Sequence, residues 1–559
     1  MRLQLVAVVP LLLIAMATDS PSQDKRPASL AGRSTVYAPH GVIATSQPLA
    51  SAAGLAVLQR GGNAIDAAVT AAAVLNLVEP HMTGIGGDMF AIVWSAKEGR
   101  LSGLNASGRS GALMTRDELL RRGHDAVPIH GAEPVTVPGA LSGWSALLER
   151  YGTISLAEAL QPAIQLAEDG FPVTPIIARQ WAAEVEKLVR DEGARATYLI
   201  DGDRAPAVGE WFRNPDFAAT LKLIAEGGPE VLYGGELGRR IVERVVELDG
   251  FLTLEDLASH RATWVVPISV DFKGYRVWEL PPNGQGIAAL EMLRILEPFD
   301  LAAMGHNSAD YLHHLIEAKK LAFADLAGWV GDPGHMSVAP EALLDDAFIS
   351  RRRSLIDPAR AAERVDPGEA LTTSETIYLS AADGFGNMVS FINSIYWEFG
   401  SGIVVPGTGF ALQNRGAGFT LEPGLANTVA PGKRPFHTII PAFVTRPTPD
   451  GGDEPWLAFG VMGGSIQPQG HVQVLLNLIV FGMDLQAAID AARFRHLDGR
   501  QVALEGPIGV AVRAELAARG HIVLPDGVVA FGGGQAVMRL ERGWAAASDP
   551  RKDGLAVGH

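Results

Sequence analysis

The chain contains no cysteine among its 559 residues. It can therefore form no disulfide bond, use no thiolate nucleophile and bind no metal through cysteine. Basic runs interleaved with aromatic residues are also missing, and the formal net charge of −16 would repel nucleic-acid phosphates. Beyond the N-terminus, no stretch of eighteen or more uninterrupted apolar residues predicts a membrane span. We find no internal repeat and no low-complexity array.

The N-terminus has the pattern of a secretory signal. Arg2 precedes an apolar run over 3–16, small residues stand before a cleavage point after Ala17, and the chain then turns polar. Pro10 and the single basic residue depart from this pattern, and a misplaced start codon or an uncleaved anchor is the alternative. We therefore expect residues 1–17 to be a signal peptide. The mature protein would then be periplasmic or secreted, and otherwise cytoplasmic.

The composition, with 47% hydrophobic and 19% charged residues, predicts a globular chain with large cores. Length alone would predict two to four domains. The alanine-rich stretch 46–77 predicts a largely buried helix with Asn63 or Asp66 as its N-cap. A strand is expected over 89–94.

Two further helices are expected over 308–326 and 485–494, the second being the one clear helix after residue 376. Among the titratable residues of the first helix are His313, His314, Glu317 and Asp325. We expect these side chains to be solvated or to form a subunit contact. No cluster of His, Asp and Glu has the sequence spacing of metal ligands, so no metal site is predicted.

Residues 376–394 have the pattern of a β-hairpin. Apolar and polar residues alternate over 376–382, a Gly/Asn/Asp turn follows at 383–387, and a second β-prone run ends at Ser394. If the turn is symmetric, Thr376 lies opposite Ser394, with Cβ atoms about 5 Å apart. Two hydroxyls then lie side by side at the open end of the hairpin. By itself, this is also the pattern of an ordinary Thr–Ser cross-strand pair.

Short motifs rich in glycine, asparagine and hydroxyl residues follow one another from about residue 41 to the last hundred residues. They are Ala-Thr-Ser-Gln-Pro-Leu-Ala-Ser (44–51), Gly-Gly-Asn-Ala-Ile-Asp-Ala-Ala (61–68), Gly-Ile-Gly-Gly-Asp (84–88), Val-Pro-Gly-Ala (137–140), Tyr-Gly-Thr (151–153), Gly-Asp-Pro (331–333), Asn-Ser-Ile-Tyr-Trp-Glu-Phe-Gly-Ser-Gly (393–402), Leu-Gln-Asn-Arg-Gly (412–416), Gly-Lys-Arg-Pro-Phe-His-Thr (432–438) and Met-Gly-Gly-Ser (462–465). In this order they resemble the γ-glutamyltransferase family of N-terminal-nucleophile (Ntn) hydrolases.

This resemblance implies an α/β (α+β) fold, a four-layer αββα sandwich formed by two fragments of one precursor. The large subunit would span residues 18–375 and the small subunit residues 376–559. Family members break the equivalent of the Glu375–Thr376 bond by attack of the threonine hydroxyl on its own preceding carbonyl. The polar, arginine-rich stretch 351–373 has the composition of an exposed, flexible segment before that cleavage site.

The chemistry requires this cleavage, because a threonine hydroxyl is a poor nucleophile without an adjacent base. As the first residue of a chain, threonine can give its proton to its own α-amine, whose unperturbed pKa is about 8. Thr372 and Thr373 are also close to the junction. The spacing of the family motif, counted back from Gly386-Asn387, selects Thr376, which also begins the alternating strand.

Three more residues receive catalytic roles from the resemblance. Ser394 stands where family members often carry a second hydroxyl residue beside the nucleophile, and a purely structural role is the alternative. Gly463 and Gly464 match the pair whose backbone N–H groups bind the developing oxyanion. A Gly-Gly sequence is otherwise a tight turn. The glycines at 84–87 are expected to allow close packing under the site.

The residues that hold the amino-acid end of a γ-glutamyl substrate do not carry over. The family's arginine falls near Ser107, and the only arginine there is Arg109. Its aspartate falls on Gly418, and its paired serines are replaced by His437 and Thr438. We expect His437 to line the pocket or to form a hydrogen bond, because in this family the α-amine acts as the base.

An expected asparagine is replaced by Tyr396, while Arg415 stands in the same strip, with Arg434 nearby. A buried α-ammonium group needs an anionic partner, and the acid that would provide one is missing. We therefore expect the substrate to be an amide with a free carboxylate held by Arg415 and without an α-ammonium group. The alternative is that Arg415 is structural.

Taken together, the sequence predicts a self-cleaving Ntn-hydrolase that hydrolyses a small carboxylated amide or an acyl amide through an acyl-enzyme on Thr376. Its expected partners are this substrate and its own second fragment, with no cofactor, no metal, no nucleic acid and no membrane after signal removal. A true γ-glutamyltransferase or glutathione hydrolase with a divergent pocket is the first alternative. An uncleaved, inactive binding protein is the second.

Overall fold

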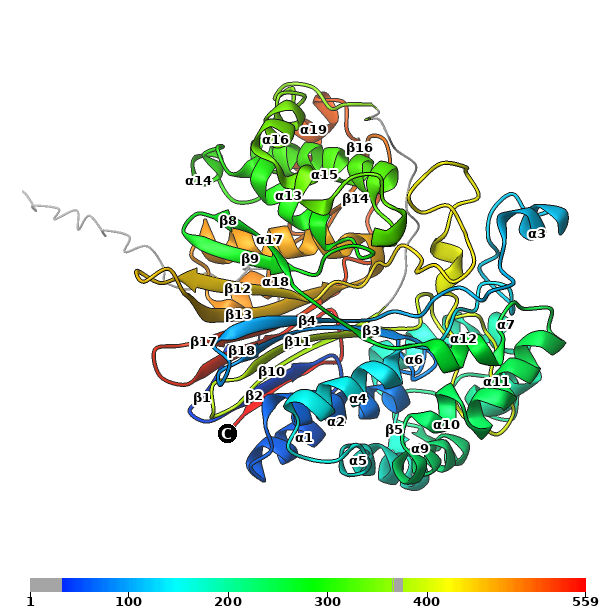
Figure 1. Cartoon of the computed structure of the whole chain (residues 1–559). Coiled ribbons are helices and arrows are strands. Elements are labelled where there is room, and N and C mark those ends of the chain that lie inside the picture. The colour runs from blue at the N-terminus through cyan, green and yellow to red at the C-terminus, as the bar shows by residue number, and fades with distance from the viewer. Residues whose placement is uncertain (1–32, 364, 366–375) are drawn as a thin grey trace, which may run out of the picture.

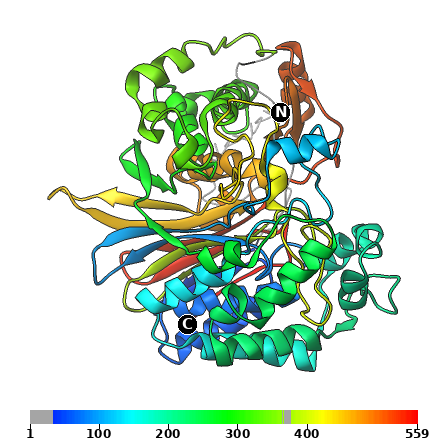
Figure 2. The ribbon, with the colours of Figure 1, turned by 45° about the vertical axis from the view of Figure 1, so that its right-hand side comes forward.

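The computed structural model describes residues 33–363, 365 and 376–559, which form two stacked β-sheets between two layers of helices (Figures 1 and 2). The predicted signal peptide, residues 1–17, and Glu375 lie outside the described residues, as does the whole stretch 366–373. Within the described part of the chain, no helix has the length and apolar character needed to cross a membrane. The predicted α/β sandwich is confirmed.

The first sheet has seven strands. In spatial order they are β1 (Val36–Ala38), β18 (Trp544–Ser548), β17 (Gly533–Arg539), β13 (Asp453–Met462), β12 (Ala442–Pro447), β9 (Tyr275–Glu279) and β8 (Ile268–Phe272). All neighbours in this sheet are antiparallel.

The second sheet also has seven antiparallel strands. In spatial order they are β19 (Leu555–Gly558), β2 (Val42–Thr45), β10 (Ile377–Ala382), β11 (Met388–Ser394), β3 (Asp88–Ser95), β4 (Arg100–Ala106) and β7 (Thr263–Val265). Two small sheets complete the strands: β14 (Phe494–His496) with β15 (Gln501–Leu504) and β16 (Ile522–Val523), and β5 (Phe171–Pro172) with β6 (Trp211–Phe212).

Helices cover the outer face of each sheet (Figure 1). On the side of the second sheet lie α1 (Pro48–Gln59), α2 (Ala64–Val78), α4 (Ala140–Tyr151), α5 (Leu156–Asp169), α6 (Pro175–Ala183), α7 (Val185–Leu188), α8 (Glu192–Tyr198), α9 (Pro215–Gly227), α10 (Glu230–Tyr233), α11 (Glu236–Glu247) and α12 (Leu254–Ser259). On the side of the first sheet lie α13 (Gly286–Leu296), α14 (Leu301–Met304), α15 (Ala309–Trp329), α16 (Asp346–Arg353), α17 (Gln467–Ile479), α18 (Leu485–Asp490) and α19 (Val510–Ala518). The short α3 spans Arg116–Arg121.

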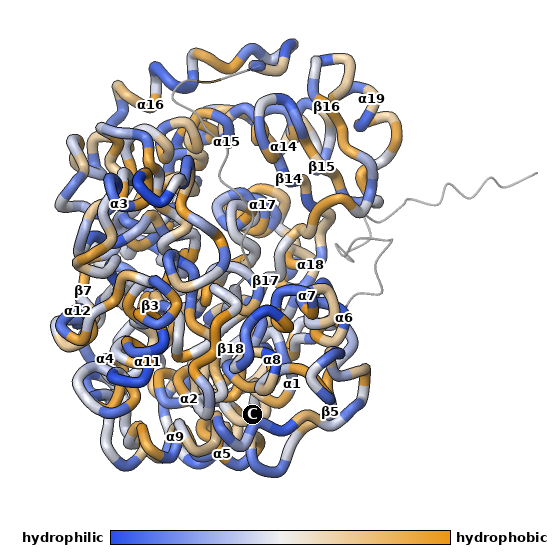
Figure 3. Tube along the Cα trace, turned by 90° about the vertical axis from the view of Figure 1, so that its right-hand side faces the viewer, coloured by the Kyte–Doolittle hydropathy of each residue, from blue (hydrophilic) through white to orange (hydrophobic). Residues whose placement is uncertain are grey.

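The core between the sheets follows the period of two residues that strands impose. Tyr378 and Phe90 of the second sheet pack there with Phe443 and Met462 of the first. The intervening residues of β10, such as Leu379, point instead toward the helices. In Figure 3, hydrophobic segments are frequent around the central strands β17 and β18. The face of the second sheet that carries Tyr378 also carries the candidate site.

Local signals explain the first helices. The stretch 46–77 is two helices rather than one, because the chain leaves the helix at Arg60 and starts again after Asn63. Asn63 is the N-cap of α2, as predicted, and forms a reciprocal capping box with Asp66. Every residue of α2 is buried, which agrees with the absence of a polar face in its sequence.

Two sequence predictions in the second half of the chain were wrong. The helix expected over 485–494 ends at Asp490, and Phe494 begins β14, where it pairs with Leu504. Helices α17 and α19 were missed, so the part after residue 376 has more than one clear helix. Tertiary pairing has overridden local preference at Phe494, because its strand is formed with residues ten positions away.

Four residues of α15 that were expected to be solvated are buried instead: His313, His314, Glu317 and Asp325. Ion pairs supply the partners that water would otherwise give: Glu317 pairs with Lys320 at 2.7 Å, and Asp325 pairs with Arg352 at 2.7 Å. Arg352 belongs to helix α16, so the beginning of the stretch 351–373 is helical and not a flexible segment. His313 lies where the two predicted fragments meet, because it forms a hydrogen bond with His521 at 2.8 Å.

Candidate functional site

Three polar side chains form a row across the second sheet. The ladder between β10 and β11 pairs Ile377 with Asn393, which sets Thr376 opposite Ser394 as predicted. Ser394 in turn pairs with Asp88 at the start of β3. Thr376 Oγ1 donates a hydrogen bond to Ser394 Oγ at 3.2 Å, and all three side chains are buried. Directly opposed residues share a face of the sheet, and this face is the one that meets the first sheet.

Glycines allow the backbone to approach this row closely. A Cβ on Gly87 would lie 2.2 Å from the carbonyl oxygen of Ser394, and one on Gly86 would lie 2.2 Å from that of Ala411. Real Cβ atoms do not approach oxygen so closely, so larger residues would push the segment away. The predicted packing role of the glycines at 84–87 is confirmed.

Arg415 links the nucleophile candidate to the other sheet. Its Nη2 donates to Ser394 Oγ at 3.2 Å, and its Nη1 donates to Thr438 Oγ1 at 2.9 Å. Burial lowers the pKa of Arg415 to about 10, and the guanidinium remains charged at neutral pH. Within the described residues, its Nε has no hydrogen-bond acceptor. A full positive charge is therefore fixed next to Ser394.

Tyr396 covers one face of this guanidinium. The Arg415 Cζ lies 4.0 Å from the centre of the Tyr396 ring, which is a close cation–π contact. Tyr396 has a φ of 83°, a left-handed conformation that few non-glycine residues adopt. Its hydroxyl oxygen lies 3.9 Å from the point where a Cβ on Gly418 would be. The ring therefore fills the space in front of Gly418.

Asp88 and His437 form a buried pair behind Arg415. His437 Nε2 donates to Asp88 Oδ2 at 3.0 Å, while its Nδ1 accepts from the backbone N–H of Ile439 at 3.3 Å. Burial, together with the positive charge of Arg415, lowers the pKa of His437 to about 4, so the ring is neutral. Burial alone would raise the pKa of Asp88, but its hydrogen bonds and the nearby Arg415 lower it. With both ring nitrogens engaged, His437 holds structure and is not available as a base.

The glycine pair lies in the turn from β13 into α17. Gly463 has a φ of 124° and Gly464 a φ of 67°. A Cβ on Gly463 would lie 2.7 Å from Ile466 Cγ2 and 3.0 Å from Gly532 Cα, so only glycine fits without strain. Gln285 Nε2 donates to the carbonyl oxygens of both Gly464, at 2.8 Å, and Thr438, at 2.6 Å.

A continuous path of hydrogen bonds therefore joins the glycine pair to the nucleophile candidate. It runs from Gly464 through Gln285, Thr438, Arg415 and Ser394 to Thr376. The path crosses from the end of the first sheet to the row formed by Thr376, Ser394 and Asp88 on the second sheet. Of its six residues, all but Gln285 were singled out from the sequence.

Arg109 is not part of this path. It pairs with Asp332 at 2.9 Å and donates to the carbonyl of Gly432, and its side chain is 44% exposed. Arg434 is nearer, since it donates to the carbonyl of Ser107 at 3.1 Å and to Thr263 at 3.0 Å. Both arginines are thus engaged with the loops that surround His437.

Sequence reasoning missed three buried residues of the site. Asp88 accepts hydrogen bonds from the backbone N–H of Gly108 at 2.8 Å and from Gln413 Nε2 at 3.0 Å, in addition to His437. Gln285 bridges two loops, as described above. Asp88 and Gln413 both belong to the motifs that carry the resemblance, and their place in those motifs was the one signal that could have identified them. Nothing in the local sequence marks Gln285.

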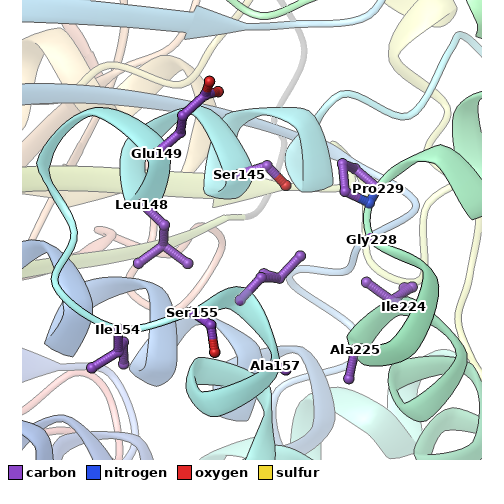
Figure 4. Close-up of a pocket in the computed structure, with 11 residues that line it drawn as sticks. Ser145, Leu148, Glu149, Ile154, Ser155, Ala157, Ile224, Ala225, Gly228 and Pro229 are labelled. Atoms are coloured by element: carbon purple, nitrogen blue, oxygen red, sulfur yellow. The ribbon is translucent and has the colours of Figure 1, made fainter.

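A separate cavity of about 390 Å³ lies on the opposite side of the second sheet, between α4, α5 and α9 (Figure 4). Leu148, Ile154 and Ile224 contribute apolar side chains, and Glu149 stands at its edge. None of the residues that line it belongs to the row or to the hydrogen-bond path. It therefore gives no support to a role in the chemistry at Thr376.

Comparisons with known proteins identify the family of the whole chain. The family model described as Gamma-glutamyltranspeptidase matches residues 50–559. The glutathione hydrolase-like YwrD proenzyme of Bacillus subtilis is 36% identical, over 92% of this chain and 98% of its own. The oxamate amidohydrolase proenzyme of Klebsiella pneumoniae is 36% identical, over 93% and 98%. The crystal structure of cephalosporin acylase from Bacillus halodurans superposes with a TM-score of 0.89 at 45% identity, covering 95% of this chain and 98% of that one.

Proposed function

Because the chain belongs to the gamma-glutamyltranspeptidase family and is an amide-hydrolysing Ntn-hydrolase, we propose that its nucleophile is the hydroxyl of Thr376. The observation that carries this proposal is the hydrogen bond from Thr376 to Ser394, which is itself bound by the buried Arg415. The relatives named as proenzymes support a precursor that cleaves itself.

Self-cleavage begins when the Thr376 hydroxyl attacks the carbonyl carbon of Glu375. The C–N bond breaks, an ester forms between Glu375 and Thr376 Oγ1, and the nitrogen of Thr376 becomes a free amine. Water then hydrolyses the ester and leaves the Glu375 carboxylate on a large fragment, residues 18–375. The small fragment, residues 376–559, begins with a threonine that carries both a nucleophile and a base.

Amide hydrolysis repeats this chemistry on the substrate. The Thr376 hydroxyl gives its proton to the α-amine and attacks the amide carbonyl, and the amine then protonates the leaving nitrogen. Ser394 directs the hydroxyl, and the backbone N–H groups of Gly463 and Gly464 hold the oxyanion. Water hydrolyses the resulting acyl ester. No cofactor is needed for any of these steps.

The surroundings of Gly418 support a substrate without an α-ammonium group. A side chain at this position would be crowded, since its Cβ would lie 3.0 Å from the carbonyl oxygen of Phe436. The Tyr396 hydroxyl is 3.9 Å from the same point, so the tyrosine takes the room that an acidic side chain would use. Without that acid, a buried ammonium has no partner and its binding is disfavoured.

The charge of Arg415 supports a substrate with a carboxylate. The guanidinium is charged and buried, its Nε has no acceptor among the residues described, and Asp88 is already bound by His437. We assign to this arginine two tasks, which are to orient Ser394 and to attract the carboxylate of a small amide. Thr438 holds Arg415 in place, His437 lines the pocket behind it, and Tyr396 shapes the pocket.

The two fragments would remain together as a heterodimer. In the second sheet, β10 and β19 of the small fragment lie on either side of β2 of the large one. In the first sheet, β12 of the small fragment pairs with β9 of the large one. Cleavage after residue 375 leaves both sheets intact, because no strand hydrogen bond is broken. The proposal also includes export of the protein, with residues 1–17 removed as its signal peptide.

Intact mass and N-terminal sequencing of the purified protein test the nucleophile. We expect two chains, the smaller beginning at Thr376, and a start at Thr18 for the larger. A Thr376→Ala variant should remain one chain without amidase activity, while Thr376→Ser should still cleave at a lower rate. Thr420→Ala, a hydroxyl outside the row, is the matched control and should behave like the wild type. A single chain from active wild-type protein would disprove the proposal.

Substrate preference distinguishes a hydrolase of carboxylated amides from a γ-glutamyltransferase. We expect kcat/KM for small dicarboxylic monoamides to exceed that for a γ-glutamyl anilide by roughly 100-fold. The reason is that, without an acidic residue in the pocket, the α-ammonium group of the anilide cannot form a charge-assisted hydrogen bond. The double variant Tyr396→Asn with Gly418→Asp should narrow this ratio. Arg109→Lys should not change it, since Arg109 lies outside the hydrogen-bond path. A wild-type preference for the γ-glutamyl substrate would favour the alternative function.

A further inference from the structure

Four buried polar residues meet where α15 of the predicted large fragment contacts the predicted small fragment. His313, Glu317 and Lys320 lie on one face of α15, and His521 follows helix α19. Figure 1 shows α19 and β16 beside α15 and α16, at the outer edge of the first helical layer. We call these four residues the latch. None of them belongs to the hydrogen-bond path of the candidate site.

The latch holds the last described segment before the cleavage site, residues 357–362. Lys320 Nζ donates to the carbonyl of Ala362 at 2.7 Å, and the backbone N–H of Ala362 donates to Glu317 Oε2 at 3.1 Å. His313 Nε2 donates to the carbonyl of Asp357 at 2.8 Å. Both backbone groups of Ala362 are therefore bound by one buried ion pair, in which Lys320 and Glu317 are 2.7 Å apart.

The small fragment closes the latch from the other side. His313 Nε2 must carry a proton to bond a carbonyl, so its Nδ1 accepts from His521 Nε2, 2.8 Å away. The backbone N–H of Ala361 donates to the carbonyl of Arg519 at 2.8 Å, and the Arg519 side chain forms an ion pair with Asp310. The segment is thus held from both fragments at once.

The same group of side chains has the geometry of a metal site, but its charges favour a hydrogen-bonded cluster. Ligand atoms of His313, Glu317 and His521 lie within 4.8 Å of one another. The ammonium of Lys320 already neutralises Glu317, and it would repel a divalent cation placed beside it. Burial lowers the pKa of His313 to about 4 and that of His521 to about 3, which keeps the histidine pair neutral.

We propose that the latch is an inter-fragment contact that keeps the C-terminal part of the large fragment bound to the small fragment after self-cleavage. The proposal rests on the proposed function, because only cleavage turns residues 357–362 into a segment with one free end. In the uncleaved chain, this segment is tethered at both ends. After cleavage, one end of the segment is free and its attachment depends more on the latch, so loss of the latch should matter much more in the cleaved protein.

Trypsin provides a direct readout, because Arg360 is exposed and the next residue, Ala361, is held by the latch region. A protease requires a locally unfolded segment, so the rate of cutting after Arg360 reports detachment. We expect Lys320→Met to raise that rate at least tenfold in the two-fragment protein. In a Thr376→Ala background, which keeps the chain whole, the increase should be less than threefold.

Lys222→Met is the matched control, since Lys222 forms an exposed ion pair with Glu168 on the far helical layer. It should leave the cutting rate at Arg360 unchanged. Equal rates for Lys320→Met and the wild type in the two-fragment protein would overturn the proposal. Glu317→Gln tests the same point without removing a cation, and it should also raise the rate.

Further outcomes are distinguishable. If intact mass shows that the wild type stays whole, the proposed self-cleavage fails. If the wild type is cleaved but Lys320→Met raises the cutting rate equally in the two-fragment protein and in the Thr376→Ala background, the inter-fragment role is refuted. If wild-type resistance to trypsin is lost on adding a chelator and restored by Zn²⁺, the group is a metal site and the latch is refuted. Resistance that is indifferent to chelator and lost in Lys320→Met supports the latch.

Discussion

Ser394 is the residue on which the hydrogen bonds of the candidate site converge. Its Oγ accepts from Thr376 Oγ1 and Arg415 Nη2, each at 3.2 Å, and from the backbone N–H of Tyr396 at 2.9 Å. In a buried site, these bonds are stronger than in water, and the charge of Arg415 polarises the serine hydroxyl. Ser394 therefore fixes the direction of the Thr376 hydroxyl and transmits the effect of the positive charge.

Replacing this serine should impair the chemistry more than the fold. In Ser394→Ala, we expect self-cleavage and kcat to fall roughly 10- to 100-fold, because the nucleophile loses its orientation. The change in KM should be small. Three donors lose an acceptor, so the variant should also lose about 1–3 kcal/mol of stability. The rate of fragment formation and steady-state kinetics on the matured protein measure these effects.

Two variants control this prediction. Ser394→Thr keeps the hydroxyl and should recover most of the activity. Ser390→Ala removes a buried hydroxyl from the same strand, one that bonds Tyr378 at 2.7 Å, and should affect stability alone. An Ser394→Ala enzyme within twofold of the wild type in both rates would show that the serine is only structural.

At the scale of elements, the turn between β13 and α17 supplies the second half of the site. The strand delivers Met462 into the core between the sheets, and the chain then reverses through two glycines with positive φ before α17 begins. Gln285, just before α13, fixes this turn through the carbonyl of Gly464. The position of the turn therefore depends on the first sheet and on α13, not on the hairpin that carries Thr376.

Gly463→Ala tests the role of this turn. The added Cβ would meet Ile466 and Gly532 in a conformation that side chains rarely adopt, so the turn must move. We expect kcat to fall at least tenfold, because the oxyanion donors are displaced. Gly451→Ala is the control: its φ of 84° is equally unfavourable, but nothing lies within 4 Å of its Cβ. It should lose about 1–3 kcal/mol of stability with unchanged kcat.

A wild-type kcat in Gly463→Ala would show that the glycine pair does not bind the oxyanion. Loss of activity in both glycine variants would instead point to a general effect on folding. Thermal unfolding, measured for each variant beside kcat, distinguishes a local displacement from such a global loss.

At the scale of the whole molecule, buried histidines make stability dependent on pH. Five deeply buried histidines have lowered pKa values, chiefly because of burial: His81, His260, His437, His471 and His496. They stay neutral in the folded protein, whereas in the unfolded chain a histidine binds a proton near its ordinary pKa of about 6.5. Below that pH the unfolded state holds more protons, so stability falls as the pH decreases.

We expect the melting temperature to be highest near neutral pH and to fall between about pH 6.5 and pH 4. Five carboxyl groups with raised pKa values act in the opposite direction: Glu279, Glu291, Glu317, Asp325 and Asp490. They are fewer than the nine histidines whose pKa values are lowered among the described residues. His471→Gln should flatten the pH dependence by up to about 1.4 kcal/mol per pH unit, the effect of one proton. Scanning calorimetry from pH 4 to pH 8 measures this slope, and an unchanged melting temperature over that range would contradict the prediction.

The sequence by itself determined the hairpin and its register. Alternation over 376–382, the turn at 383–387 and the β-prone run to Ser394 are local signals, and a symmetric turn leaves one pairing for Thr376. The helix α2 and its cap were also readable, because a capping residue and an uninterrupted apolar stretch act within one element. Ordered motifs along the chain were sufficient to recognise the family.

Only the tertiary structure decided what surrounds the nucleophile. Asp88 and His437 are 349 residues apart, and Gln285 joins loops from two different parts of the chain, so no local pattern connects them. The burial of α15 could not be predicted from the sequence either, since its polar residues find partners on α16 and after α19. The charges of a site depend on burial and on partners that are distant in the sequence, and both arise only when the layers pack. Short-range sequence preferences act within single elements and therefore do not reveal them.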